Sequence, residues 1–156
     1  MENNNLTTIS LFSGAGGMDL GFENSGFGIE WSNDSDKDSC ETYNENFKTK
    51  INHGLIEDYM NKLNNFKYVD CIFGGPPCQD FSQVRGSRED LGLKMTRGNL
   101  YSHFIRALTR AEPKVFVFEN VPGLVSSNGG AAYKTIIEDF ENLNVKWTKI
   151  KNKRKK

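Results

Sequence analysis

A cysteine in a proline-stiffened loop is the residue of this chain best suited to do chemistry. Residues 74–82 read GGPPCQDFS and follow the apolar run of residues 69–73, which is typical of a buried strand. Cys78 is therefore expected beyond the carboxyl end of that strand, where ligands and catalytic groups gather in open α/β sheets. Because prolines fix φ, the thiol would be held in place, and Cys78 is a candidate nucleophile. The alternative is a free cysteine that only fills space.

Glu119 is the carboxyl group that could act together with this thiol. Residues 114–118 read KVFVF and predict another buried strand, with Glu119 and Asn120 at its end. A parallel sheet could make the two strands neighbours, so that a thiolate and a carboxyl converge on one substrate. Alternatively, Glu119 and Asn120 only cap the next turn.

A glycine-rich turn follows the first predicted strand. Residues 7–12 predict that strand, and the sequence SGAGG of residues 13–17 leads into a predicted helix. Glycines in this place let a ligand lie against backbone amides at a helix amino terminus. Asp34 comes after a second predicted strand, residues 27–31, and is the residue type that binds a ribose hydroxyl pair. The turn could instead be merely close-packed, and Asp34 could be a helix cap.

Strands and helices alternate along the rest of the chain, which indicates an α/β fold with a mainly parallel, doubly wound sheet. We further expect a helix through residues 40–47, a strand fragment and a helix within residues 51–66, a helix over residues 100–108, a helix from about residue 131 to 143, and a strand near residues 145–150. The segment 83–98 is rich in glycine and arginine. It predicts a mobile loop that could close on phosphates, or else a solvated surface loop.

The composition predicts one soluble domain. The 156 residues are 37% hydrophobic and 26% charged, and no apolar run approaches the roughly 20 residues of a membrane span. The polar amino terminus does not have the pattern of a secretory signal, which favours a cytoplasmic location. The three cysteines form no CxxC pair, and two histidines do not complete a zinc site, so we expect no bound metal.

The basic residues are distributed unevenly. The formal net charge is zero, but residues 149–156 hold six of the 20 lysines and arginines and no acidic residue. The rest of the chain then carries 14 basic and 20 acidic residues, whereas a self-sufficient DNA binder is expected to have a basic surface. Contacts with nucleic acid would therefore be local or shared with another part. Residues 151–156 form a basic tail that could also be a nucleic-acid arm.

Four blocks in the correct order make this sequence similar to the cytosine-5 DNA methyltransferase family. Residues 11–23 resemble its methyl-donor loop, residues 75–82 its nucleophile block, residues 97–101 the block after its mobile loop, and residues 119–121 its acid block. The resemblance implies an incomplete Rossmann-like methyltransferase fold that uses S-adenosylmethionine. Residues 1–150 would be a partial catalytic domain, followed by the tail.

The resemblance also implies a reaction, the transfer of a methyl group to C5 of a flipped-out cytosine in double-stranded DNA. Cys78 would form a covalent adduct at C6, and Glu119 would hold the N3 and N4 edge and supply a proton. The implied cofactor-binding residues are Phe12, Gly14, Ala15, Gly16, Gly17, Asp34, Ser35, Ile56, Pro76 and Leu100. The implied substrate-binding residues are Gln79, Ser82, Arg85 and Asn120. A role in restriction–modification would follow.

The chain departs from the family pattern in two respects. In the donor pocket, Asp34 replaces a longer glutamate, Ser35 an aromatic residue and Leu55 an aspartate, so we expect weaker donor affinity. The family's arginine block, target-recognition region and carboxyl-terminal helix do not follow residue 150. The chain could therefore be an inactive remnant, or a noncatalytic subunit that needs a second polypeptide. Cytosine-5 methylation of RNA is a further alternative.

Overall fold

The computed structural model describes residues 6–66, 68–77 and 100–154, and its account of side chains leaves out residues 127–128 and 144–154. The chain divides into two compact units. The first contains residues up to Pro77 together with Leu100–Glu119, and the described part of the second begins at Asn120. The predicted site residues within the described ranges lie almost entirely in the first unit.

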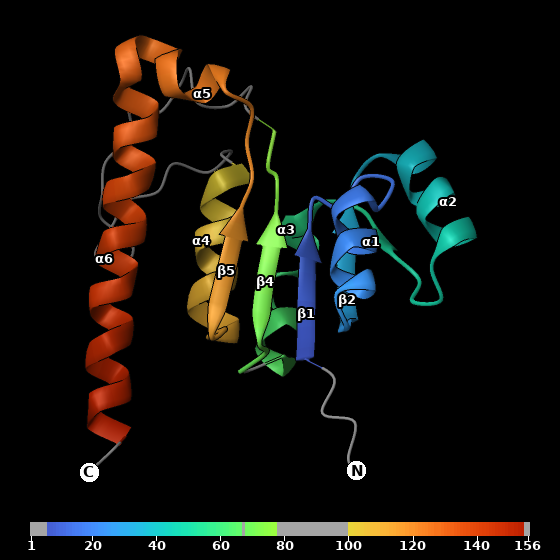
Figure 1. Ribbon diagram of the computed structural model, residues 1–156, viewed down its shortest axis with the longest axis horizontal. Coiled ribbons are helices and arrows are strands. Elements are labelled where there is room, and N and C mark those ends of the chain that lie inside the picture. Colours follow the sequence, from blue (N-terminus) through green and yellow to red (C-terminus); the bar gives the residue numbers. More distant parts are fainter. Residues whose placement is uncertain (1–5, 67, 78–99, 155–156) are drawn as a thin grey trace. The chain divides into compact units, whose positions relative to one another are not determined.

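The first unit is built on a five-stranded parallel sheet in the order β3-β2-β1-β4-β5 (Figure 1). Its strands are β1 (Leu6–Leu11), β2 (Phe27–Asp34), β3 (Asn52–His53), β4 (Cys71–Gly74) and β5 (Val115–Phe118). This arrangement confirms the predicted doubly wound class. Because β1 pairs with β2 on one side and with β4 on the other, the order of the strands reverses between β1 and β4. Ligands of open α/β sheets bind at such a switch point.

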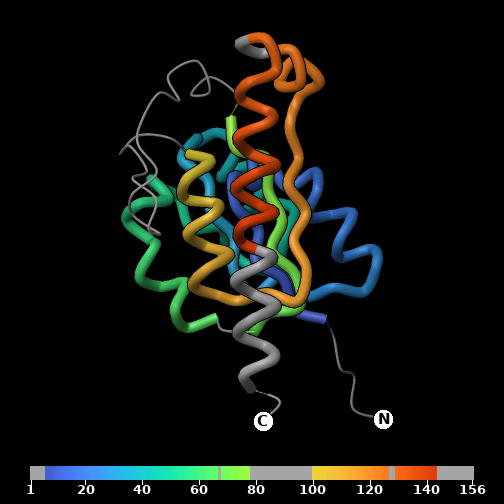
Figure 2. The backbone as a smooth tube through the Cα atoms, turned by 90° about the vertical axis from the view of Figure 1, so that its left-hand side faces the viewer, coloured from blue at the N-terminus to red at the C-terminus, as the bar shows by residue number. Residues whose placement is uncertain are grey.

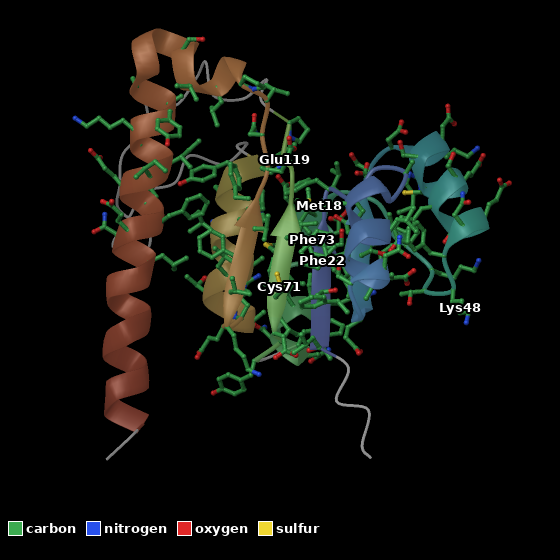
Figure 3. The ribbon with its side chains drawn as sticks, in the orientation of Figure 1. Met18, Phe22, Lys48, Cys71, Phe73 and Glu119 are labelled. Carbon is green, nitrogen blue, oxygen red and sulfur yellow. The ribbon has the colours of Figure 1, made fainter. Side chains whose placement is uncertain are left out.

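Helices cover both faces of this sheet, as Figure 2 shows for α1 and α4. The helical elements are α1 (Gly17–Asn24), α2 (Lys37–Asn46), α3 (Ile56–Tyr59), the 3-10 turn η1 (Lys62–Asn65) and α4 (Leu100–Ala111). On one face, Phe22 of α1 stacks on Phe73 of β4 with ring centroids 3.9 Å apart (Figure 3). On the other face, Phe104 of α4 packs edge-to-face on Phe116 and Phe118 of β5. The two apolar layers fix the sheet between the helices.

Strand β5 is less buried than its apolar sequence suggests. Phe116 and Phe118 are half-buried beneath α4, but Val115 and Val117 are 54% and 41% exposed. The prediction of a buried strand is therefore wrong for the face of β5 that carries Val115 and Val117. In β-strands successive side chains point to opposite faces, and α4 covers only one face of β5. On the opposite face the apolar cluster with α1 involves β2 and β4, not β5.

The second unit contains α5 (Gly123–Ser126), the 3-10 turn η3 (Ser127–Gly130) and α6 (Ala131–Arg154). The helix expected over residues 131–143 is confirmed, but the strand expected near residues 145–150 is wrong, because α6 continues through it. No glycine or proline interrupts residues 131–154, and the many lysines there are good helix formers. Among the residues described, no helix has both the length and the apolar character needed to cross a membrane.

Gly74 provides a test of how tightly β4 is packed on β1. A Cβ atom at Gly74 would collide with the backbone carbonyl of Leu11, so Gly74→Ala should lower the free energy of unfolding by about 1–3 kcal/mol. Gly28→Ala on β2 is the matched control, because the nearest atom to its added Cβ would be 3.9 Å away. Urea unfolding followed by circular dichroism measures both. Equal losses of stability in the two variants would contradict this packing.

Candidate functional site

The predicted site residues of the first unit gather at one edge of the sheet, where the five parallel strands end. Phe12 follows β1, Asp34 ends β2, Ile56 begins α3 after β3, Gly75 follows β4, and Glu119 follows β5. Figure 3 shows Glu119 at this edge, beyond the ends of β4 and β5. The fold therefore brings the predicted donor-binding residues and the predicted acid to the same side of one sheet.

The turn after β1 has the backbone shape that a close ligand needs. Phe12, Gly14 and Gly16 all have positive φ values, of 56°, 55° and 91°. Glycine adopts this left-handed conformation at little cost, whereas for Phe12 it is unusual. The turn is held from β2, because the Gly14 amide donates a hydrogen bond of 2.8 Å to Asp34 Oδ2. The Gly14 amide and the Asp34 carboxylate thus meet in the turn that precedes α1.

Asp34 holds two backbone amides and is not the cap of α2. Its Oδ1 accepts a hydrogen bond of 2.8 Å from the Asp36 amide. The helix cap is Asp36, whose Oδ1 accepts a 2.8 Å bond from the Ser39 amide. Hydrogen bonds from the Ser39 hydroxyl and amide lower the pKa of Asp36. A carboxylate oxygen can accept two hydrogen bonds, so each oxygen of Asp34 can still accept one from a hydroxyl. The half-buried Asp34 therefore fits the predicted contact with a ribose.

The other predicted cofactor residues differ in how they could act. Ala15, Gly17 and Ser35 are exposed, Leu100 is half-buried, and Ile56 and Pro76 are buried. The exposed residues can contact a ligand directly, whereas the buried ones can only shape the surface around it. Leu55, just before α3, is 56% exposed and presents an apolar side chain beside this edge.

Glu119 lies against the segment that leads to Cys78. Its amide donates a hydrogen bond of 3.0 Å to the carbonyl oxygen of Gly74. A Cβ atom built on Gly75 would be only 2.6 Å from Glu119 Oε2, so the carboxyl occupies space that any larger residue would need. Because Glu119 is also exposed, its carboxyl is accessible to a substrate.

The predicted nucleophile itself lies outside the described residues, as do Gln79, Ser82 and Arg85. The other two cysteines are poor candidates. Both Cys40 and Cys71 are buried, and burial raises the pKa of Cys71 to about 11 and also raises that of Cys40. Since the thiolate is the attacking form, neither is activated at neutral pH.

Asn120 belongs to the second unit, where its Oδ1 accepts a 2.9 Å hydrogen bond from the Val121 amide. This contact agrees with the alternative that Asn120 shapes the turn after β5. Within the part of the chain that the structure describes, no three histidine, cysteine or acidic side chains are grouped so that they could hold a metal ion.

A buried polar cluster beneath the glycine turn was not predicted from the sequence. Asp19 is fully buried, and its two carboxylate oxygens accept 2.9 Å hydrogen bonds from Ser10 and Tyr43. An aspartate in the first turn of a helix usually indicates an exposed charge that favours the helix dipole. Nothing in the spacing of the three residues predicts that they meet, because they come from β1, α1 and α2.

The fold and this edge together define a class of protein. A parallel sheet in this strand order, a glycine turn after the first strand and a carboxylate at the end of the second are features of Rossmann-like proteins that bind nucleotide cofactors. Within that class, the chain belongs to the C-5 cytosine-specific DNA methylase family, whose family model matches residues 6–151. The family resemblance of the four sequence blocks is thereby confirmed.

Curated relatives agree with this assignment. The chain is 47% identical to DNA (cytosine-5-)-methyltransferase M.ApeKI of Aeropyrum pernix over 93% of its own length and 35% of that protein. It is 43% identical to type II methyltransferase M.NgoFVII of Neisseria gonorrhoeae over 90% of its length and 37% of that protein. It is 38% identical to type II methyltransferase M.AquIA of a Picosynechococcus species over 84% of its length and 54% of that protein. The chain therefore spans little more than a third of the first two relatives.

Solved structures show the same fold. An E. coli prophage protein, provisionally assigned as a DNA modification methyltransferase, superposes with a TM-score of 0.66 at 28% identity, over 88% of this chain and 38% of that one. The Dnmt2 methyltransferase of S. pombe gives a TM-score of 0.62 at 24% identity, over 86% of this chain and 42% of that one. At that identity, the second likeness concerns the fold alone.

The bond between Asp34 and Gly14 can be tested by amide hydrogen exchange. Asp34→Ala removes a charged acceptor, which contributes about 1.5–3 kcal/mol, so the Gly14 amide should exchange at least about 10-fold faster. Asp36→Ala is the control. It should destabilise the protein by about 1 kcal/mol through loss of the α2 cap, while leaving the protection of Gly14 unchanged. If both variants changed Gly14 alike, Asp34 would not hold the turn.

Proposed function

We propose that this chain provides the donor-binding and catalytic part of a methyltransferase that acts on C5 of cytosine in DNA. The observation that carries the proposal is the close approach of Glu119 to Gly75, at the sheet edge that also holds the glycine turn and Asp34. Cys78 comes three positions after Gly75 in the sequence. In this proposal Cys78 attacks a base, and the Glu119 carboxyl acts on the same base. Family membership gives the reaction class.

S-adenosylmethionine is the donor that the residues of the turn fit. In this proposal Asp34 accepts the ribose hydroxyls, and Phe12, Gly14, Ala15, Gly16 and Gly17 form the surface under the amino-acid portion. The adenine would lie near Ser35 and Ile56, with Pro76 and Leu100 on the side of the reacting methyl group. When bound, the donor supplies an electrophilic methyl group. The exposed Leu55 cannot accept a hydrogen bond from adenine, which supports the expectation of weaker binding.

The proposed chemistry uses one thiol and one carboxyl. The Cys78 thiolate forms a bond to C6 of cytosine, the C5–C6 double bond shifts to C4–C5, and the electron pair displaced from the C4–N3 bond takes a proton from the Glu119 carboxyl at N3. The resulting enamine makes C5 nucleophilic. After C5 has been methylated, a base removes the C5 proton, the electron pair re-forms the C5–C6 double bond, and Cys78 leaves as a thiolate. Glu119 recovers its proton from N3.

Double-stranded DNA is the proposed substrate, with the target cytosine flipped out of the stack because a stacked base does not expose C6 to a thiol. In this proposal Gln79, Ser82, Arg85 and Asn120 contact the flipped nucleotide or its phosphates. The two curated relatives M.NgoFVII and M.AquIA are named type II methyltransferases, which supports a role in restriction–modification. A cytoplasmic location remains a prediction.

A second candidate function is that of one subunit of a two-chain enzyme. The chain spans 35% and 37% of two relatives and 54% of M.AquIA. In this proposal residues 1–150 are a partial catalytic domain, residues 151–156 are a basic tail, and another polypeptide supplies the remaining family segments. The alternatives of an inactive remnant and of RNA methylation are outcomes of the same test.

Transfer of tritiated methyl groups tests the proposal. The chain is assayed alone and with a polypeptide that carries the remaining segments of a relative, on duplex DNA and on transfer RNA. We expect transfer to DNA, at least in the mixture, abolished by Cys78→Ala and reduced about 100- to 10,000-fold by Glu119→Gln, the usual contribution of a general acid. Cys71→Ala, which removes a buried, protonated thiol, is the control and should retain activity.

Each other outcome of this assay has a defined meaning. Activity in the mixture alone would identify a subunit, and transfer to RNA instead of DNA would identify the other substrate. Binding of the donor without any transfer, in the mixture or alone, would indicate a remnant and contradict the catalytic proposal. Equal losses in Cys78→Ala and Cys71→Ala would contradict the assignment of the nucleophile.

A further inference from the structure

A fully buried carboxyl group lies directly beneath the glycine turn, and the reaction described above does not use it. Asp19 belongs to the first turn of α1 and has no exposed surface. Its Oδ2 accepts a hydrogen bond of 2.9 Å from the Ser10 hydroxyl on β1, and its Oδ1 accepts one of 2.9 Å from the Tyr43 hydroxyl on α2. One side chain therefore connects the strand, the first helix and the second helix.

Both partners of Asp19 reach the glycine turn. The Ser10 and Ser13 hydroxyl oxygens are 2.7 Å apart. Because Ser10 gives its only proton to Asp19, Ser13 donates to Ser10 at 2.7 Å rather than to the Asn33 carbonyl, which lies 3.4 Å from the Ser13 hydroxyl. The Ser13 amide in turn donates a 3.1 Å hydrogen bond to the Asn33 carbonyl, next to Asp34.

Tyr43 reaches the turn on its other side. A Cβ atom built on Gly16 would be 3.0 Å from Tyr43 Cδ2 and would overlap the ring of Phe47, which stacks on Tyr43 with centroids 4.2 Å apart. The two rings therefore lie directly against Gly16. When Asp19 holds the Tyr43 hydroxyl, it also fixes the ring that limits where Gly16 can move.

We propose that Asp19 is a positioning residue for the methyl donor, holding the glycine turn in its binding shape through Ser10 on one side and Tyr43 on the other. This inference rests on the proposed function, since it assumes that the turn binds the donor. Asp19 itself does not contact the donor in this account, because it is fully buried. It acts on Ser13 and Gly16, one on each side of the exposed residue Ala15.

The chemistry of the cluster favours a specific role over simple packing. Burying a carboxyl costs free energy. Desolvation raises the pKa of Asp19, and the negative charge of the nearby Glu23 raises it further. An apolar residue could fill the same space without that cost, but it would leave two buried hydroxyl groups without their acceptor. Burial also raises the pKa of Tyr43, so its hydroxyl keeps its proton and remains a donor. Only an acceptor with two oxygens satisfies both neighbours.

Asp70 provides a matched control for substitutions at Asp19. Asp70 also accepts hydrogen bonds from a β1 residue and from another element, namely 2.8 Å from the Thr7 amide and 2.5 Å from Lys114 Nζ. It precedes β4 and so lies at the opposite, amino-terminal edge of the sheet. Asp70→Asn should lower stability without affecting the glycine turn, and it separates loss of stability from loss of positioning.

The test compares the full chain with Asp19→Ala, Asp19→Asn, Tyr43→Phe and the Asp70→Asn control. Calorimetry measures binding of S-adenosylhomocysteine, and spectra of 15N-glycine-labelled protein report the amides of Gly14, Gly16 and Gly17. We expect Asp19→Ala to weaken binding about 10-fold or more, as for loss of hydrogen bonds to a charged group, and to shift the glycine amides. Asp19→Asn, which keeps one acceptor oxygen, should recover part of the loss. Tyr43→Phe should weaken binding less than Asp19→Ala.

The outcomes separate this inference from the proposed function. Unchanged affinity and unchanged glycine amides in folded Asp19→Ala would overturn it, as would equal effects of Asp70→Asn. If Asp19→Ala does not fold, Asp19→Asn and Tyr43→Phe decide by the same criteria. If the unaltered chain binds no S-adenosylhomocysteine, the donor-binding proposal fails, and the inference that Asp19 positions the donor fails with it. A shift of the glycine amides in Asp19→Ala would then show only that Asp19 holds the turn.

Discussion

The close approach of β4 to β1 at their carboxyl ends is the constraint on which the site depends. Gly74 lies so near the Leu11 carbonyl that a single added carbon would collide with it. Because β1 ends here and leads into the proposed donor turn, and β4 ends here and leads toward Cys78, this contact sets the distance between the starting points of the two segments. A methyl donor and its acceptor must be close enough to react, and a backbone-to-backbone contact defines their starting points more rigidly than side chains could.

A second close approach, between Glu119 and the two glycines at the end of β4, holds the proposed acid at the same edge of the sheet. Glu119 is hydrogen-bonded through its amide to Gly74, and its carboxyl lies against Gly75. The two adjacent glycines therefore have different neighbours: Gly74 lies against β1 and Gly75 lies against Glu119, the proposed acid. The hydrogen bonds around Asp34 and Asp19 then shape the turn on the donor side. Each part of the site among the described residues is held by the backbone or by groups hydrogen-bonded to it.

The sequence predicted most of this architecture because its signals are local. Apolar runs such as residues 69–73 and the glycine turn after β1 identify strands and turns, and parallel topology then places their ends together. Predictions failed where the outcome depends on distant neighbours. We predicted a strand near residues 145–150, but α6 continues through them, and no glycine or proline interrupts residues 131–154. The exposure of Val115 and the burial of Asp19 depend on which helix covers which residue, and spacing along the chain does not contain that information.

The most direct measurement of the central claim is a crystal structure of the chain with S-adenosylhomocysteine. The account predicts that the ligand lies on the turn of Gly14 and Gly16, with its ribose on Asp34 and its sulfur directed toward Pro76 and the segment that leads to Cys78. Glu119 would face the same space from β5. A ligand bound elsewhere, or a Glu119 carboxyl directed away from its sulfur, would contradict the claim that this sheet edge unites donor, nucleophile and acid.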